Sequence, residues 1–155
     1  MLKLHYDIDI AASAETVWHA LFDPENYRAW TKVFDPGSHY VGSFDAEGNR
    51  LHFISESGAG MYSELERLIP NEEAVIRHIG VLEPEGTELP ITKEAEKWSG
   101  SRESYRLVPI DGGVRLQATL DAEEEFVESM NTIFPEALAI VKTLAEEHGS
   151  VRSDG

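Results

Sequence analysis

The chain opens with apolar and polar residues in strict alternation. From Leu2 to Ile10, every second residue is apolar and each residue between them is charged or a histidine. A period of two places all the apolar side chains on one face of a strand. The segment therefore predicts a strand with one buried face and one face in water.

Two short helices are predicted directly after this strand. Ser13 is placed to cap the first helix. Its apolar residues recur at helical spacing: Val17, Trp18, Leu21 and Phe22. Asp23 and Pro24 supply an N-cap and a first helical residue for the second helix, whose short apolar face is Tyr27 and Trp30.

Further strand-like runs follow, separated by turn-forming residues such as Asp111-Gly112-Gly113. They cover residues 38–44, 51–55, 61–69, 74–81, 101–108 and 114–120. Strands joined by tight turns predict an antiparallel sheet. The one long connection, residues 82–97, is acidic and contains two prolines, so we expect it to be the most mobile segment.

A long amphipathic helix is predicted over residues 122–148. Its apolar stripe consists of Phe126, Met130, Ile133, Phe134, Ala137, Leu138, Val141, Leu144 and Ala145. Asp121 and Glu124 fit a capping box at its start, and Gly149 is expected to end it. Pro135 lies inside the pattern and is expected to kink or restart the helix.

The expected organisation is one domain over residues 1–149 and a flexible tail over residues 150–155, because a chain of 155 residues corresponds to about one domain. There is no cysteine, which excludes disulfides, thiolate nucleophiles and thiolate metal sites. The histidines show no paired ligand spacing, so no metal site is expected.

Charge and hydropathy limit the classes of partner that the chain can bind. The net charge is −16, from 29 acidic and 13 basic residues, so phosphate backbones and anionic lipids should be repelled. We expect no nucleic-acid partner and no membrane insertion, and we interpret the acidic residues as a solvated surface rather than a docking face for a basic partner. The chain shows neither a signal peptide nor a membrane-spanning run, which favours a cytoplasmic location.

Short motifs at consistent separations connect the chain to a known family. They are Val17-Trp18, Trp30-Thr31, Phe34-x-x-Gly37-Ser38, Gly42-Ser43, Gly60-Met61, His78-x-Gly80, Trp98-x-Gly100-x-x-Glu103-x-Tyr105-x-Leu107, Pro135-Glu136-Ala137-Leu138 and Leu144-Ala145-Glu146. With this order of elements, the chain resembles the START-like superfamily (SRPBCC, birch-pollen-allergen-like). Within it, the chain looks like the branch named for the activator of the ninety-kilodalton heat-shock chaperone ATPase.

The resemblance implies an α+β helix-grip fold, β-α-α-β(6)-α, in which a curved antiparallel sheet wraps around a long C-terminal helix. It also implies an apolar cavity between sheet and helix. The residues expected to bind a ligand there are Trp30, Phe34, Phe53, His78, Trp98, Glu103, Tyr105, Met130, Phe134 and Leu138.

Glu103 is the first candidate for chemistry. It shares one face of its strand with Tyr105 and Leu107, while Arg102 and Arg106 lie on the other. We therefore expect Glu103 to point inward, where desolvation would raise its pKa and suit it to general acid or base catalysis. A structural role is the favoured interpretation, in which Glu103 lies near the cavity mouth or pairs with a core histidine.

His78 is the second candidate. Both faces of its strand are partly apolar, so the pattern alone does not orient it, and the resemblance implies that it points inward. If it meets Glu103, the two form either an acid–base pair or a buried structural hydrogen bond. Gly80 indicates a close approach of chains or a bulge nearby.

Three functions remain open. The leading hypothesis is binding of a small hydrophobic molecule in the cavity, without a cofactor. The alternatives are a cofactor-free cyclase or dehydratase that uses Glu103 or His78 as a proton shuttle, and a co-chaperone-like interaction module. Because the chaperone activator family carries an additional amino-terminal domain and this chain begins with the first strand, a chaperone partner is not expected. A homodimer stays open.

Overall fold

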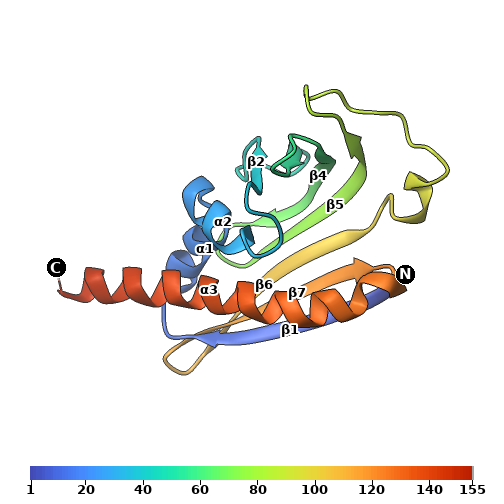
Figure 1. Ribbon diagram of the computed structural model, residues 1–155. Coiled ribbons are helices and arrows are strands. Elements are labelled where there is room, and N and C mark those ends of the chain that lie inside the picture. The colour runs from blue at the N-terminus through green and yellow to red at the C-terminus, as the bar shows by residue number, and fades with distance from the viewer. Residues whose placement is uncertain (155) are drawn as a thin grey trace.

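A seven-stranded antiparallel sheet curves around one long helix (Figure 1). The computed structural model describes the backbone of residues 1–154 and the side chains of residues 1–148. The strands lie in the order β1-β7-β6-β5-β4-β3-β2. Their bounds are β1 Leu2–Ile10, β2 His39–Val41, β3 Arg50–Ile54, β4 Gly60–Ile69, β5 Glu73–Leu82, β6 Arg102–Ile110 and β7 Gly113–Ala122. The predicted helix-grip α+β fold is confirmed.

The first strand has the bounds that its alternation predicts. Its apolar residues become progressively more buried along β1, from the exposed Leu2 to Ile10 in the core, whereas the residues between them are exposed. β1 pairs with β7 from Leu2 opposite Ala122 to Ile10 opposite Val114. This pairing places the first and the last strand of the chain next to each other at one edge of the sheet.

The two short helices start where predicted, but only the first has its predicted side-chain cap. In α1 (Ala14–Phe22), the backbone N–H of Thr16 donates to the Ser13 hydroxyl oxygen at 3.1 Å. α2 (Pro24–Thr31) begins at the proline. Asp23 precedes it in extended conformation, but its carboxylate contacts the His19 ring, with 2.9 Å between Oδ1 and Nδ1, and does not cap α2.

The long helix, α3 (Val127–Asp154), differs from its predicted bounds at both ends. β7 extends to Ala122 and a 3-10 turn, η2 (Glu124–Phe126), follows, so the helix starts later than predicted. The predicted capping box does not form, because the Asp121 carboxylate accepts the backbone N–H of Arg102 at 2.9 Å. Pro135 lies inside the helix without ending it.

At its far end, α3 continues through Gly149, which was predicted to stop it. Of the predicted flexible tail, residues 150–155, Gly155 and all the side chains lie outside the described residues, so that prediction stays open. Within the described part of the chain, no helix has the length and apolar character needed to cross a membrane.

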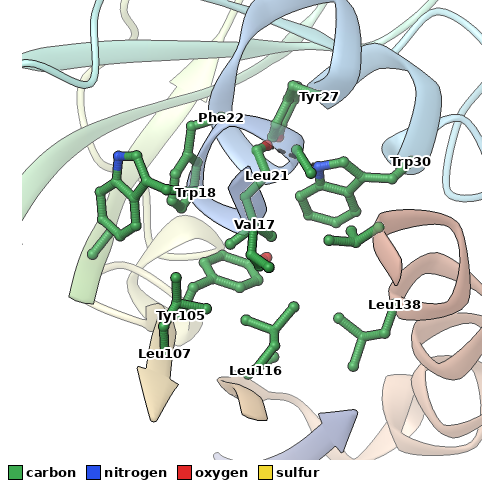
Figure 2. Packing of buried hydrophobic residues seen from close by; sticks show 14 of the residues in the cluster. Val17, Trp18, Leu21, Phe22, Tyr27, Trp30, Tyr105, Leu107, Leu116 and Leu138 are labelled. Carbon is green, nitrogen blue, oxygen red and sulfur yellow. Dashed lines mark hydrogen bonds between the residues drawn. The ribbon is translucent and has the colours of Figure 1, made fainter. Parts of the chain in front are cut away.

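The hydrophobic core lies where the three helices meet the concave face of the sheet (Figure 2). Trp30 is central to it: its side chain is 1% exposed, and its indole N–H donates to the Leu21 carbonyl oxygen at 2.8 Å. Its ring centroid is 5.9 Å from that of Tyr105 on β6, in an edge-to-face arrangement. This contact fixes α2 over the sheet, beside the cavity described below.

Candidate functional site

A cavity of about 400 Å³ lies between the sheet, α2 and the N-terminal part of α3. Aromatic and aliphatic side chains supply most of its wall, which is typical of small-molecule pockets of this size. Phe126, in the turn before α3, borders the cavity and is 49% exposed. The concave face of the sheet forms the opposite wall.

The residues predicted to line a cavity come together here, with one exception. Those that line it are Trp30, Phe34, Phe53, His78, Trp98, Glu103, Tyr105, Met130 and Phe134. Leu138 does not: it is 1% exposed and lies in the hydrophobic core. The cavity ends near Phe134, because beyond it the apolar stripe of α3 packs against α1 and α2. That these residues bind a ligand stays a prediction.

A chain of polar groups crosses one wall of the cavity. Nε2 of His78 lies 2.9 Å from Oε1 of Glu103, and Nδ1 of His78 lies 2.7 Å from the Ser63 hydroxyl. The Tyr105 hydroxyl donates to the other carboxylate oxygen of Glu103. An ionised carboxylate only accepts hydrogen bonds, so Nε2 carries the hydrogen in the contact with Glu103. We name His78, Ser63, Glu103 and Tyr105 the polar cluster.

Strand register produces the polar cluster. On β5, Ala74, Ile76 and His78 face inward, as the resemblance implies for His78. On β6, Glu103 and Tyr105 face inward, as predicted. The pairing of β5 with β6 sets Ile76 opposite Glu103, close enough for the His78 ring to reach the carboxylate.

A register shift between β4 and β5 completes the cluster. Between Tyr62 and Ser63 the pairing with β5 skips one residue, so Tyr62 lies opposite Gly80 and Ser63 opposite His78. The predicted close approach at Gly80 is present, because a Cβ there would lie 2.6 Å from the Tyr62 hydroxyl. Ser63 is fully buried, and its hydroxyl is satisfied by the histidine. Gly80 was the sequence signal for an irregularity here, but no pattern identified Ser63 as the partner of His78.

The electrostatics of Glu103 correct one expectation. Burial has the largest single effect and raises the pKa of Glu103. The hydrogen bond and charge of His78 and the hydrogen bond from Tyr105 act in the opposite direction, and together they lower this pKa below the ordinary value. Glu103 is therefore a carboxylate at neutral pH, and the prediction that desolvation would dominate is wrong.

Both tyrosines nearest to Glu103 keep their protons. Burial raises the pKa of Tyr105 well above its ordinary value, and the charge and hydrogen bond of Glu103 raise it further. Burial, followed by the charges of Glu103 and Tyr40, likewise raises the pKa of Tyr27. Both hydroxyls are therefore available as hydrogen-bond donors at neutral pH.

Tyr27 is a lining residue that the sequence reasoning assigned only to the apolar face of α2. It is 8% exposed and borders the cavity. Among the described residues, its hydroxyl has no hydrogen-bond partner, unlike that of Tyr105. Its spacing from Trp30 and Thr31, which also line the cavity, is one helical turn, and this spacing was the signal that could have placed it there.

Acidic side chains outnumber basic ones around the cavity, where the charge of His78 acts on Glu103. Lysine and arginine are absent from its described lining, whereas four carboxyl side chains border it: Asp35, Glu103, Asp121 and Glu123. Within the described residues, no group of three histidine or carboxyl side chains could hold a metal ion. The chemistry that this lining offers is hydrogen bonding and proton transfer by the polar cluster.

Comparisons with known proteins identify the fold. Neither protein-family models nor curated protein sequences gave a match. The Aha1 dimer from Colwellia psychrerythraea is 22% identical, with a TM-score of 0.68, and the match covers 94% of this chain and 97% of that one. The AHSA1-like protein from Aeromonas hydrophila is 18% identical, with a TM-score of 0.65, and the match covers 96% and 94%.

A third solved structure is DynU16, a protein in the dynemicin biosynthetic locus. It is 13% identical, with a TM-score of 0.68, over 95% of this chain and 48% of DynU16. At these identities the likeness concerns the fold. The chain therefore has the same helix-grip fold as these solved structures.

Proposed function

We propose that this protein binds a small hydrophobic molecule in the cavity between the sheet and α3. The observation that carries the proposal is the cavity itself, about 400 Å³ of space walled mainly by apolar and aromatic side chains, with the polar cluster on one side. Apolar burial would supply affinity, and the few polar groups would orient the ligand. The solved structure of DynU16, a protein of the dynemicin biosynthetic locus, is compatible with a small-molecule role.

A thermal-shift screen of lipids and aromatic polyketides, with native mass spectrometry of gently purified protein, tests the proposal. A ligand at about 100 times its Kd should raise the Tm by roughly 5–10 °C. Met130→Trp should fill the cavity and abolish the shift. The matched control is Ser129→Trp, which places the same side chain on the exposed side of α3 and should retain it. Absence of any bound molecule and of any shift would contradict the proposal.

A second candidate is a cofactor-free enzyme of the cyclase or dehydratase type. The observation in its favour is that His78 and Glu103 form a hydrogen-bonded pair that borders the cavity. An ionised Glu103 suits a base or a partner that orients His78, rather than a general acid. Glu103→Gln should then abolish turnover of a bound polyketide while leaving its binding largely intact. Equal loss of both would exclude this role.

The quaternary state that we propose is a homodimer. The support is that the solved Colwellia psychrerythraea protein of the same fold is described as a dimer. Sedimentation equilibrium over a range of protein concentrations measures the mass directly. A monomer mass at the highest concentration would contradict the homodimer without affecting the ligand proposal.

A further inference from the structure

The Glu103 carboxylate has acceptor capacity that the protein does not use. Its two oxygens offer about four acceptor positions, and His78 and Tyr105 each occupy one. The side chain is 25% exposed, and it borders the cavity. A hydrogen-bond donor on a ligand could therefore reach a charged acceptor that is already held in place from two sides.

Tyr27 adds a second polar point in the same wall. Its hydroxyl has no described partner, although the residue is 8% exposed and borders the cavity. Among the described residues no fully buried side-chain oxygen or nitrogen lacks a partner, so this hydroxyl is open to solvent, and a ligand group could take up its free hydrogen-bonding capacity. The charge of Glu103 contributes to raising the Tyr27 pKa, which places the two groups within electrostatic reach of each other.

The lining charges argue against an anionic ligand. Glu103 is ionised, and three further carboxyl groups border the cavity. The described lining holds no lysine or arginine, and its histidine, His78, is already paired with Glu103. Asp121 does have a cation nearby, since Lys3 Nζ lies 3.4 Å from its Oδ1, but the Lys3 side chain is 58% exposed and does not border the cavity. A ligand carboxylate would meet like charge in a poorly hydrated space.

The remaining wall selects a flat apolar body. The rings of Tyr27, Trp30, Phe53, Tyr105 and Phe134 border the cavity. Several of them already pack edge to face, with 5.4 Å between the ring centroids of Tyr27 and Trp30. Aromatic walls favour aromatic ligands through offset-stacked and edge-to-face contacts.

From these observations we infer that the cavity selects a neutral, mainly aromatic molecule whose hydroxyl or N–H group donates to Glu103, and that it discriminates against carboxylates of the same shape. The inference rests on the proposed binding function and narrows its ligand class. Fatty acids and aromatic acids are thereby excluded, whereas phenols and related neutral donors are included.

Four probes of nearly the same shape test the inference by isothermal titration calorimetry at neutral pH: biphenyl, para-hydroxybiphenyl, para-methoxybiphenyl and para-biphenylcarboxylate. The phenol should bind about tenfold to hundredfold more tightly than the methyl ether, which keeps the oxygen but lacks the donor. It should exceed the carboxylate by at least about tenfold. Biphenyl should bind measurably through apolar contact alone.

Two variants test whether Glu103 causes the preference for the phenol over the carboxylate. Glu103→Gln removes the charge and adds an amide donor, so the preference for phenol over carboxylate should fall at least about tenfold. Glu125→Gln removes the same charge from an exposed position that does not border the cavity, and should keep the wild-type preference. The probe comparison on the wild-type protein stands even if Glu103→Gln fails to fold.

The outcomes separate the inference from the function beneath it. Carboxylate binding equal to or tighter than phenol binding would overturn the inference and leave ligand binding intact. Equal affinities for the phenol and its methyl ether would overturn the role of the donor. If none of the four probes binds, biphenyl included, the proposed binding function fails and the inference fails with it.

Discussion

The His78 ring and the Glu103 carboxylate lie 2.9 Å apart, between Nε2 and Oε1, although they come from different strands. The contact joins β5 to β6 at the cavity wall, next to the backbone hydrogen bond from His78 N–H to the Ser101 carbonyl oxygen at 2.9 Å. The pairing of the two strands thus sets the contact that helps to keep Glu103 ionised in the cavity wall. Its consequences can be measured without knowledge of the ligand.

Glu103 should make the stability of the fold depend on pH. Its folded-state pKa is lowered below the ordinary value, so its stabilising contribution is complete above the unfolded-state pKa and is lost as pH falls through the folded-state value. The stability advantage of wild type over Glu103→Gln should therefore shrink between about pH 5 and about pH 2. Urea unfolding of both proteins across this range measures it.

Comparison with a non-titrating variant removes the effect of the many other carboxyl groups, because they are common to both proteins. Glu125→Gln, at an exposed position, is the control and should show no such convergence. An advantage that stays constant or grows as the pH falls would contradict the lowered pKa of Glu103.

Tyr105→Phe should destabilise the protein more than Tyr62→Phe does. The Tyr105 hydroxyl donates to an ionised carboxylate, whereas the Tyr62 hydroxyl donates to the Leu89 carbonyl oxygen at 2.7 Å. Hydrogen bonds to charged groups contribute about 1.5–3 kcal/mol, and neutral ones about 0.5–1.5 kcal/mol. Urea denaturation gives both values, and an equal or reversed order would contradict a charged Glu103.

Much of the fold follows from local patterns. Alternation gives the bounds of β1 because a strand with one buried face must have period two. Ser13 caps α1 as expected because the cap is a local interaction between residues three apart. The alternation of residues along β6 likewise predicts that Glu103 and Tyr105 face inward, and both line the cavity.

Long-range pairing limits the rest. The segment after Leu120 has an apolar and acidic pattern that suits a helix start, yet it continues as strand because Ala122 pairs with Leu2 on β1. Similarly, the shift that sets Ser63 opposite His78 depends on how β4 meets β5. His78 and Tyr105 lower the pKa of Glu103, so burial alone could not predict the direction of its shift.

Gly80 should tolerate no side chain while Tyr62 occupies its position opposite. A Cβ on residue 80 would lie 2.6 Å from the Tyr62 hydroxyl oxygen and 2.7 Å from its ring. Gly80→Ala should therefore cost about 1–3 kcal/mol of folding free energy through overpacking. In the background of Tyr62→Ala, which removes the ring, the same substitution should cost less, with a coupling energy of about 0.5–3 kcal/mol. Strict additivity in urea denaturation would contradict the close contact.

Leu138 and Met130 share the apolar stripe of α3, but truncation should destabilise the protein more at Leu138 than at Met130. Leu138 lies in the core and is 1% exposed, whereas the partly buried Met130 borders the cavity. Leu138→Ala should cost about 2–5 kcal/mol, because it opens a hole among packed side chains. Met130→Ala should cost less than about 2 kcal/mol, because it enlarges a space that already exists.

The two variants should also separate in ligand binding, measured by calorimetry with para-hydroxybiphenyl at a temperature where both are folded. Met130→Ala removes part of the cavity wall and should weaken binding, whereas Leu138→Ala leaves the wall in place and should bind as wild type does. Each variant is the other's control, since both shorten an apolar side chain on the same helix. Weaker binding in Leu138→Ala than in Met130→Ala would contradict the end of the cavity at Phe134, because binding would then depend on a residue beyond it.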